Sequence, residues 1–545
     1  MNRSAFRDLS VVITVSCLYA LQAVGQAGQW TWMKGPQSPG GTGVYGTQGV
    51  ASAANHPPGC VNQYSWTAQD GTFWMFGGQD NSGQSLAALW KYDPTTNNWT
   101  WMKGPTTFYF LGVFGTQGVE AATNLPPAKT FGGASWVDLD GNFWMYGGEN
   151  GDNYNNNTNN DLWKYDPTTN NWTWMKGTFL DNPPAVWGTM GVPDISNQPP
   201  ARNNCYATWV DDQGDLWMFG GMLLQDPGDD LWRYNIASNT WTWMNGSQTT
   251  NTTAVYGAMG VQASTNTPGG RLSYAFGKSA DGMLWLQGGG VGPGFYGWGD
   301  VWRLDPSSGE WTWMSGSANA NPPVSTGTEC VQSSTNDPGK RLASPTWQTT
   351  DGRMWTFGLV SSSGVPQYNY SRNDMWTFCP TTLTWTWVHG PAANDVPGSW
   401  GTLGIGSPTN RPNGRSMASA WVALNGDLYL FGGIPLGAFA TYGDLWRFTP
   451  DAACGACSTS LQVNEHALDA IGISPDPVVD GILHADLPAG FWSIDVLDMT
   501  GRRIAGTNKS AGRMDLDIGP MPNGSYVLVA HTGQAVHKAK FMVAR

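Results

Sequence analysis

Apolar and polar residues alternate along much of this chain in short runs that end at turn residues. In residues 130–175 the apolar runs are 135–137, 143–146, 162–165 and 172–175, and Asp140-Gly141 and Asp166-Pro167 lie between them. Glycine tolerates positive φ and proline fixes φ near −65°, so both dipeptides favour turns. Side chains of a strand alternate between its two faces, so Trp172 and Trp174 share one face. The pattern predicts four short antiparallel strands.

This four-strand pattern recurs along the chain. The tryptophan of the third predicted strand returns at intervals of 69 to 74 residues, at Trp90, Trp163, Trp232, Trp302, Trp376 and Trp446. A Trp-Thr-Trp strand occurs at 30–32, 99–101, 172–174, 241–243, 311–313 and 385–387. Six repeats of four antiparallel strands predict an all-β fold, a six-bladed β-propeller.

The two ends of the repeat predict how the ring closes. The first Trp-Thr-Trp copy precedes every complete unit, and the last unit, which ends near Pro450, has no such strand after it. Residues 29–33 are therefore expected to supply the outer strand of the sixth blade. Closure of this kind hides sheet edges that an open array would expose.

The N-terminus and the charge balance restrict where the protein works. Arg3 and Arg7 precede an apolar run from Leu9 to about Val24, and small residues follow at Gly25 and Ala27, so residues 1–27 are expected to be a signal peptide. No later apolar run is long enough for a transmembrane span. Forty acidic residues against 27 basic ones repel phosphates and argue against a nucleic-acid partner.

A Gly-Gly pair after the second strand of the repeat is a feature shared with a known family. It occurs at Gly77-Gly78, Gly147-Gly148, Gly220-Gly221, Gly288-Gly289 and Gly432-Gly433, and the fifth unit departs with Gly358-Leu359. With the fourth-strand tryptophan and the arginine before the first strand, this resembles the kelch motif of galactose oxidase-like propellers. The resemblance covers about residues 28–450 and implies the fold. Kelch propellers host oxidases, glycan binders and protein-binding scaffolds, so it leaves the function open.

Long loops connect each fourth strand to the next first strand and contain their own repeat, Val44 to Val50 in its first copy. These connections and those between strands two and three leave the same face, where binding residues are expected. A basic set precedes the first strands at Lys129, Arg202, Arg271, Arg341 and Arg415. It is predicted to surround the channel mouth and hold an anionic ligand. The alternative is that these cations pair with loop carboxylates and carbonyls.

Aromatic residues of the loops form two groups. Tyr45, Phe114, Trp187, Tyr256 and Trp400 repeat at one position and are expected to pack. The segments 108–110 and 295–298 do not repeat, so Tyr109, Tyr296 and Trp298 are candidate ligand contacts, with loop packing as the alternative. The Asn-rich stretch 152–161 has oxygens suited to calcium but lacks the features of an EF-hand, and a solvated loop is expected.

The sequence gives little support for an enzymatic activity. A copper oxidase site of the galactose oxidase type would need two His and two Tyr, and the repeat region contains only His56 and His389, in surroundings that do not match that family. No nucleophile elbow, phosphate loop or zinc-protease helix is present. We therefore expect no cofactor, no metal and no catalytic residue. A glycan-active hydrolase, lyase or oxidase on the loop face is the alternative.

Six cysteines follow the expected signal peptide, at 60, 205, 330, 379, 454 and 457. An even number in an exported protein permits disulfides without identifying the pairs. Cys454-Gly-Ala-Cys457 has no second CxxC partner for zinc, so a local disulfide is expected there. The repeat region is predicted to span 28–452 and to be followed by a linker over 453–470.

Residues 471–545 have a different pattern, with alternating apolar residues between glycine turns, which predicts a small β-sandwich. Gly501-Arg502, Pro522-Asn523-Gly524-Ser525-Tyr526 and the basic final strand resemble the C-terminal sorting domain of type IX secretion substrates. Ser474-Pro475-Asp476-Pro477 departs from the usual Asn-Pro opening, and an adhesive module is the alternative. The resemblance implies outer-membrane secretion machinery as a partner, and release from, or display on, a Gram-negative cell. The expected function is binding of a glycan or an extracellular protein through the long-loop face.

Overall fold

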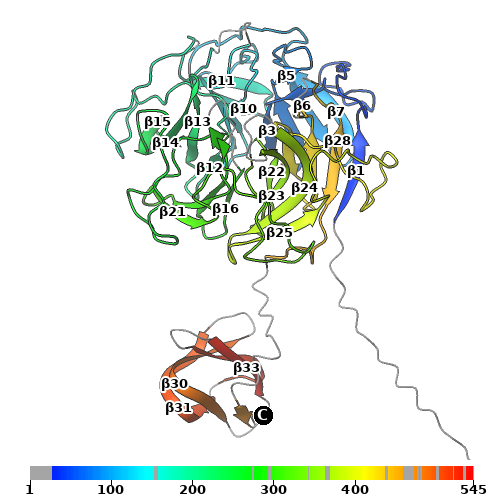
Figure 1. Ribbon diagram of the computed structural model, residues 1–545. Helices are drawn as coiled ribbons and strands as arrows, with labels where there is room; N and C mark the ends of the chain where they lie inside the picture. The colour runs from blue at the N-terminus through cyan, green and yellow to red at the C-terminus, as the bar shows by residue number, and fades with distance from the viewer. Residues whose placement is uncertain are drawn as a thin grey trace, which may run out of the picture. The chain divides into compact units, whose positions relative to one another are not determined.

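The computed structural model contains strands and no helix among the residues it describes. In the first part of the chain these residues are 28–151, 157–178, 180–205, 207–272, 275–291, 296–341, 343–362, 369–435 and 440–457. In the second part they are 472–474, 478, 481–498, 503–519, 521–531 and 536–543. The chain divides into two compact units between Cys457 and Ser458 (Figure 1). No described helix is long and apolar enough to cross a membrane.

The described part of the first unit contains six four-stranded antiparallel sheets, numbered here in chain order. The first three are β3 (Tyr64–Thr67), β4 (Phe73–Phe76), β6 (Leu89–Asp93), β7 (Asn98–Lys103); β8 (Ala134–Val137), β9 (Phe143–Tyr146), β10 (Leu162–Asp166), β11 (Asn171–Lys176); and β12 (Thr208–Val210), β13 (Leu216–Leu223), β14 (Asp226–Asn235), β15 (Thr240–Asn245). The next two are β16 (Ala275–Lys278), β17 (Leu284–Gln287), β20 (Val301–Asp305), β21 (Glu310–Ser315); and β22 (Thr346–Gln348), β23 (Met354–Ser362), β24 (Asn369–Cys379), β25 (Thr384–His389). The sixth is β26 (Ser419–Val422), β27 (Leu428–Phe431), β28 (Leu445–Thr449), β1 (Gln29–Lys34).

The sixth sheet joins the two ends of the repeat region. Its outer strand is β1, which pairs antiparallel with β28 and sets Trp32 opposite Trp446. The same Trp–Trp register recurs within the other sheets, as between Trp90 and Trp101 in the first. The prediction that the first Trp-Thr-Trp segment completes the last unit is confirmed.

The first strands of the six sheets lie next to one another. β3 contacts β8, β8 contacts β12, and the sequence continues through β16 and β22 to β26, which contacts β3. Indole hydrogen bonds join neighbouring sheets: Trp66 Nε1 donates to the carbonyl of Trp144 over 3.1 Å, and Trp136 Nε1 donates to that of Trp217 over 2.8 Å. These contacts arrange the sheets around a common centre, as Figure 1 shows for the labelled strands.

Between the sheets the core consists of aromatic residues. The first tryptophan of each Trp-Thr-Trp segment is almost fully buried and contacts the preceding sheet. Trp172, for example, packs edge-on against Phe76 and Trp66 of the first sheet. Large rings stabilise by buried area and by edge-to-face geometry, so each sheet depends on its neighbour for a core.

The long loops cover the outer edge of each sheet. In the first sheet the amides of Gly49 and Ser52 donate to the carbonyls of Trp101 and Trp99 in β7, and Asn55 Nδ2 bonds to the carbonyls of Val50 and Trp99. Equivalent asparagines do the same in the other sheets, at Asn124, Asn197, Asn266, Asn336 and Asn410. This repeated part of the loops therefore protects a strand edge that would otherwise pair with other chains.

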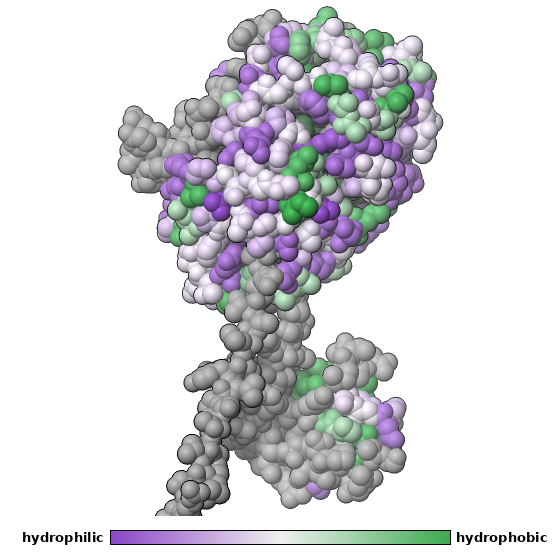
Figure 2. Space-filling view, turned by 90° about the vertical axis from the view of Figure 1, so that its right-hand side faces the viewer, coloured by the Kyte–Doolittle hydropathy of each residue, from purple (hydrophilic) through white to green (hydrophobic). Residues whose placement is uncertain are grey.

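Covering the edge leaves several apolar residues of these loops exposed, and one repeated position is exposed in all six loops. Val50, Val119, Val192, Val261, Val331 and Ile405 are each between 48% and 61% exposed. In the face shown in Figure 2, hydrophobic residues form small patches separated by polar ones. Single exposed apolar residues are usual on protein surfaces and do not by themselves mark a binding site.

Two disulfides attach the segment after β28 to the fifth sheet. Cys454 pairs with Cys330 of a long loop, and Cys457 pairs with Cys379 at the end of β24. The expected local bond between Cys454 and Cys457 is therefore wrong. At Gly455 the segment lies against β24 and β25, and Arg353 donates to the carbonyl of Cys454 over 2.9 Å. These contacts bring Cys454 to Cys330 and Cys457 to Cys379. Cys60 and Cys205 are buried free thiols.

The second unit, described by itself, contains one five-stranded sheet made of β29 (Gly472–Ser474), β30 (Ile482–Asp498), β31 (Arg503–Asp517), β32 (Gly524–His531) and β33 (Val536–Val543). β30 changes register after Leu487 and pairs with β29 through its first half and with β32 through its second half. One core joins both halves, including Leu483, Ile494 and Phe541. The described strands thus form one hydrogen-bonded sheet with a common core, and the expected sandwich stays a prediction.

Candidate functional site

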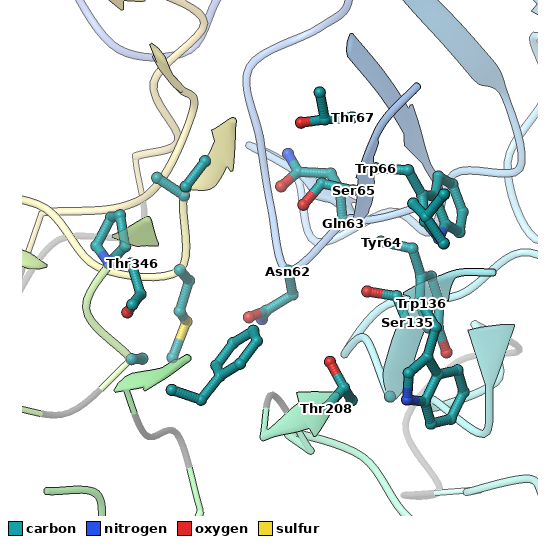
Figure 3. Close-up of a pocket in the computed structure, with 18 of the residues that line it drawn as sticks. Asn62, Gln63, Tyr64, Ser65, Trp66, Thr67, Ser135, Trp136, Thr208 and Thr346 are labelled. Carbon is teal, nitrogen blue, oxygen red and sulfur yellow. The ribbon is translucent and has the colours of Figure 1, made fainter. Parts of the chain in front are cut away.

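A cavity of about 320 Å³ lies among the first strands of the six sheets. Asn62, Ser135, Thr208 and Thr346 come from four different sheets or the loops before them and surround the same space (Figure 3). Apolar side chains such as Phe276 and Met417 complete the lining. The lining residues that the structure describes carry no formal charge, so this central cavity suits neutral groups.

The five predicted cations lie elsewhere. Each is at most 3% exposed and forms an ion pair with an aspartate two residues before the third-strand tryptophan: Lys129–Asp161, Arg202–Asp230, Arg271–Asp300, Arg341–Asp374 and Arg415–Asp444. None of the five lines the central cavity. The alternative that they pair with carboxylates is confirmed. Ligand binding by these residues stays a prediction, to which the observed geometry lends no support.

The ion pair belongs to a repeated structural unit. In the sixth sheet Arg415 donates to both carboxylate oxygens of Asp444 and to the carbonyl of Gly432, and Trp446 Nε1 donates to Asp444 over 2.7 Å. Such bidentate, fully hydrogen-bonded pairs are the form in which charges are tolerated in a protein interior. They fix the long loop against the third strand.

The first sheet lacks this pair. Cys60 stands six residues before Trp66, as Arg415 stands six before Trp421, and Ala88 takes the aspartate position two residues before Trp90. Cys60 and Ala88 are 1% and 3% exposed and belong to one apolar cluster. Burial raises the pKa of the Cys60 thiol to about 12, so this thiol is not a reactive nucleophile. Both charges are replaced together, which leaves no unpaired ion.

The repeating loop aromatics pack as expected. Tyr45 contacts Trp90 and Trp101, with ring centroids 4.9 and 5.4 Å apart, and Trp187 contacts Trp232 and Trp243 in the same way. Phe114, Tyr256 and Trp400 occupy the equivalent places in their sheets. These rings support the loop that covers the edge of each sheet.

The non-repeating aromatics differ from one another. Trp298 is half-buried and lies over the guanidinium of Arg271, 4.9 Å from its ring centroid, so packing accounts for it. Tyr296 belongs to β19 (Tyr296–Gly297), which pairs with β18 (Gly290–Val291), and its side chain lies outside the described residues. Phe295 also lies outside them. Tyr109 and Phe110, in contrast, line a cavity.

This second cavity has a volume of about 430 Å³ and lies on the long-loop side of the second sheet. Tyr109, Phe110, Leu111 and Phe114 form its apolar side, and Asn150, Asn159 and Asp181 form its polar side. Asn150 Nδ2 donates to Asp181 Oδ1 over 2.9 Å, which orients both groups. Of the predicted contacts, Tyr109 is thus brought into a concave site.

Three of the residues in this cavity were not foreseen from the sequence. Asp181 is one of many loop acids in the sequence, and Asn150 and Asn159 flank or belong to the Asn-rich stretch. Residues 152–156 of that stretch lie outside the described residues. The one signal for Asp181 in the sequence is that its loop differs from the equivalent loop around Tyr109, so it is not part of the repeat. The cavity brings together segments about 30 to 70 residues apart in the chain, which only the folded unit does.

The histidines considered for copper are placed apart from any ligand cluster in the described residues. His389 is buried, and its Nε2 lies 2.9 Å from the carbonyl oxygen of Pro408. His56 Nδ1 lies 3.1 Å from the carbonyl oxygen of Pro57. Within the described ranges, no three His, Cys, Asp or Glu side chains are grouped closely enough to hold a metal ion.

Comparison with known families adds one match. The Kelch motif model matches residues 67–102, which run from the end of β3 through β7. The chain carries a kelch repeat. Together with the repeated four-stranded sheets, the match fits a kelch β-propeller, a fold used for binding and protein interaction. No curated protein matches the chain.

Proposed function

We propose that the first unit is a closed six-bladed kelch propeller that binds a ligand outside the cell. Pairing of β1 with β28 and the contact of β26 with β3 support closure and the number of blades. A ring fixed by inter-sheet hydrogen bonds and two disulfides is a rigid scaffold, and rigid scaffolds with variable loops are suited to recognition.

The proposal includes export. Disulfides Cys330–Cys454 and Cys379–Cys457 form in oxidising compartments, consistent with a signal peptide over residues 1–27. We further propose that the second unit is a sorting domain that engages outer-membrane secretion machinery. Its support is the motif resemblance of residues 471–545 and the separate compact unit after Cys457.

The second cavity is the observation that carries the binding function. It combines aromatic side chains with amide and carboxylate groups in a volume typical of small-ligand sites. The repeated loop segments are occupied in covering strand edges, so the non-repeating segments around Tyr109 and Asp181 are the ones available for recognition. We propose that a glycan or an extracellular protein is bound there.

The test uses the chain without residues 1–27, applied to an array of neutral and acidic glycans and to extracellular protein fractions, with product analysis for cleavage. We expect saturable binding without turnover. Turnover of a bound glycan would replace the binding function by the enzymatic alternative. Absence of binding to every glycan and protein fraction would refute a recognition role.

A further inference from the structure

Tyr109 has a backbone conformation that its side chain disfavours. Its φ is +55°, in the left-handed region that β-carbon sterics make costly for bulky residues. The backbone amide of Tyr109 donates to the carbonyl of Ser85 over 3.2 Å, which holds the conformation in place. Such strain persists where the surroundings fix it, and it is concentrated at functional sites.

The other sheets show what this position ordinarily contains. Gly40, Asn182, Asn251 and Asn321 also have positive φ, and their amides donate in the same way to Thr441, Thr158, Pro227 and Gly297. Glycine and asparagine tolerate this conformation at little cost. The fold therefore accepts glycine or asparagine at this position. Of the five equivalent residues, only Tyr109, in the loop that borders the second cavity, has a bulky ring.

The polar side of the cavity determines which ligands it admits. Among the described residues that line it, Asp181 is the one that carries a charge. The nearest cation in this sheet, Lys129, is 1% exposed in its side chain and donates to Asn159 Oδ1 and Asp161 Oδ1, both over 2.9 Å. Lys129 is paired with Asp161, so Lys129, Asp161 and Asp181 together carry a net negative charge, which repels an anionic ligand.

Aromatic rings beside amide and carboxylate groups match one ligand chemistry well. A pyranose ring presents an apolar face of C–H groups, which stacks on an aromatic ring, and a rim of hydroxyls. These hydroxyls donate to carboxylates and exchange hydrogen bonds with amides. We propose that the second cavity binds a neutral sugar residue, with Tyr109 as the stacking ring and Asp181 and Asn150 as the hydroxyl-binding groups. This inference rests on the proposed binding function and specifies its ligand class.

The experiment compares matched sugar pairs on the full chain without residues 1–27. Methyl glucoside and methyl galactoside, and oligomers of each, are titrated beside the corresponding uronates by calorimetry and saturation-transfer NMR. We expect binding of a neutral sugar at least tenfold tighter than that of its uronate. Asp181→Asn is expected to weaken neutral binding and to reduce the discrimination against the uronate.

The decisive variant is Tyr109→Asn, because asparagine is the residue of three equivalent positions. We expect at least a tenfold loss of sugar binding together with a melting temperature no lower than that of the parent chain. Asn251→Ala, at the equivalent position of another sheet, is the control and should leave binding unchanged. A loss of binding that accompanies a lower melting temperature would indicate a structural role and overturn the assignment.

Other outcomes separate this inference from the proposed function. Glycan binding that Tyr109→Asn leaves intact, or a preference for uronates, would overturn the sugar site while the binding function stands. Binding of an extracellular protein without any sugar binding would have the same effect. Absence of all binding would remove both proposals.

Discussion

Trp421 in the sixth sheet donates a hydrogen bond from Nε1 to the main-chain carbonyl of Trp74 in the first sheet, over 3.2 Å. The two residues are 347 positions apart in the chain. The same bond joins Trp66 to Trp144 and Trp136 to Trp217, where the partners lie in consecutive sheets. The contact between the last sheet and the first thus has the same form as the contacts within the repeat.

Pairing with β28 makes β1 essential to the stability of the sixth sheet. Trp30 is fully buried against Phe357, Trp446 and Phe448. Trp30→Ala is expected to lower the free energy of unfolding by about 3–5 kcal/mol, and deletion of residues 28–34 by more. Urea unfolding followed by tryptophan fluorescence measures this loss. The signal reports on the first unit, because Trp492 is the only tryptophan after Cys457. Trp99→Ala, the same change within a continuous sheet, is the matched comparison; unchanged stability of the deletion would contradict closure by β1.

The Cys60–Ala88 replacement predicts non-additive mutations in the sixth sheet. Asp444→Ala alone leaves Arg415 buried without its carboxylate and should cost about 3–5 kcal/mol. The pair Arg415→Cys with Asp444→Ala reproduces the first-sheet residues and should cost less than Asp444→Ala alone. Free energies of unfolding of the single and double variants test this. A double variant less stable than both single variants would show that the first sheet depends on something other than removal of both charges.

The edge-covering loops depend on a donor rather than on the shape of the asparagine. Asn266 Nδ2 donates to the carbonyls of Val261 and Trp311 over 2.9 and 3.1 Å. Asn266→Ala removes both donors, and we expect a loss of about 1–3 kcal/mol; Asn266→Asp keeps the shape and should cost more, because its buried carboxylate would face two carbonyls. Thermal unfolding gives the loss, and hydrogen exchange of β21 shows whether the edge opens. If Asn266→Asp were neutral, the hydrogen bonds would have no part in stability.

Much of the fold follows from the sequence because its signals are local and repeated. The turn at Asp140-Gly141 and the spacing of Trp172 and Trp174 are properties of short segments, and the unpaired Trp-Thr-Trp at 30–32 predicts the strand that completes the sixth sheet. The candidate site is harder to predict from the sequence. Whether Arg271 faces a channel or Asp300, and whether Tyr109 and Asp181 line one cavity, depends on which loops the folded unit brings together.

The long loops show the same limit in another way. Their repeat from Val44 to Val50 is visible in the sequence, but its role in covering β7 is not, because the partner carbonyls of Trp99 and Trp101 follow about 50 residues later. The cysteines likewise give no pairing by spacing alone. Cys454 and Cys457 lie close enough in sequence to pair with each other, and tertiary contact with the fifth sheet directs both elsewhere.

The disulfides predict a specific response to reduction. Peptide mapping without reduction should recover Cys330 with Cys454 and Cys379 with Cys457, and a Cys454–Cys457 peptide would contradict the pairing. Loss of a disulfide that closes a loop of this length typically costs about 2–4 kcal/mol. Dithiothreitol should therefore lower the melting temperature of the parent chain. A variant with all four cysteines changed to serine should start lower and no longer respond, and Cys205→Ser, at a free thiol, should keep the response.

His389 predicts a dependence of stability on pH. Burial lowers the pKa of His389 to about 4; the hydrogen bond with the carbonyl of Pro408 opposes this shift, and the charge of Arg411 contributes to it. In the unfolded chain a histidine titrates near pH 6.5. Between pH 6.5 and 4 the unfolded state therefore binds a proton that the native state does not, and stability present above pH 6.5 is lost as the pH falls. The difference in pKa corresponds to about 3 kcal/mol.

Substitution isolates this contribution from the carboxylates that titrate in the same range. In the native ring Nε2 faces the carbonyl of Pro408, while Nδ1 is buried without a hydrogen-bond partner among the described residues, so protonation there is unfavourable. His389→Gln keeps a donor for Pro408 and removes the titration. The free energy of unfolding of the parent chain should fall between pH 7 and 4.5 by about 2–3 kcal/mol more than that of the variant. His56→Gln, on a half-buried loop residue, is the control. Parallel pH profiles for the parent chain and His389→Gln would contradict this, because they would show that the pKa of His389 is the same in the folded and the unfolded protein.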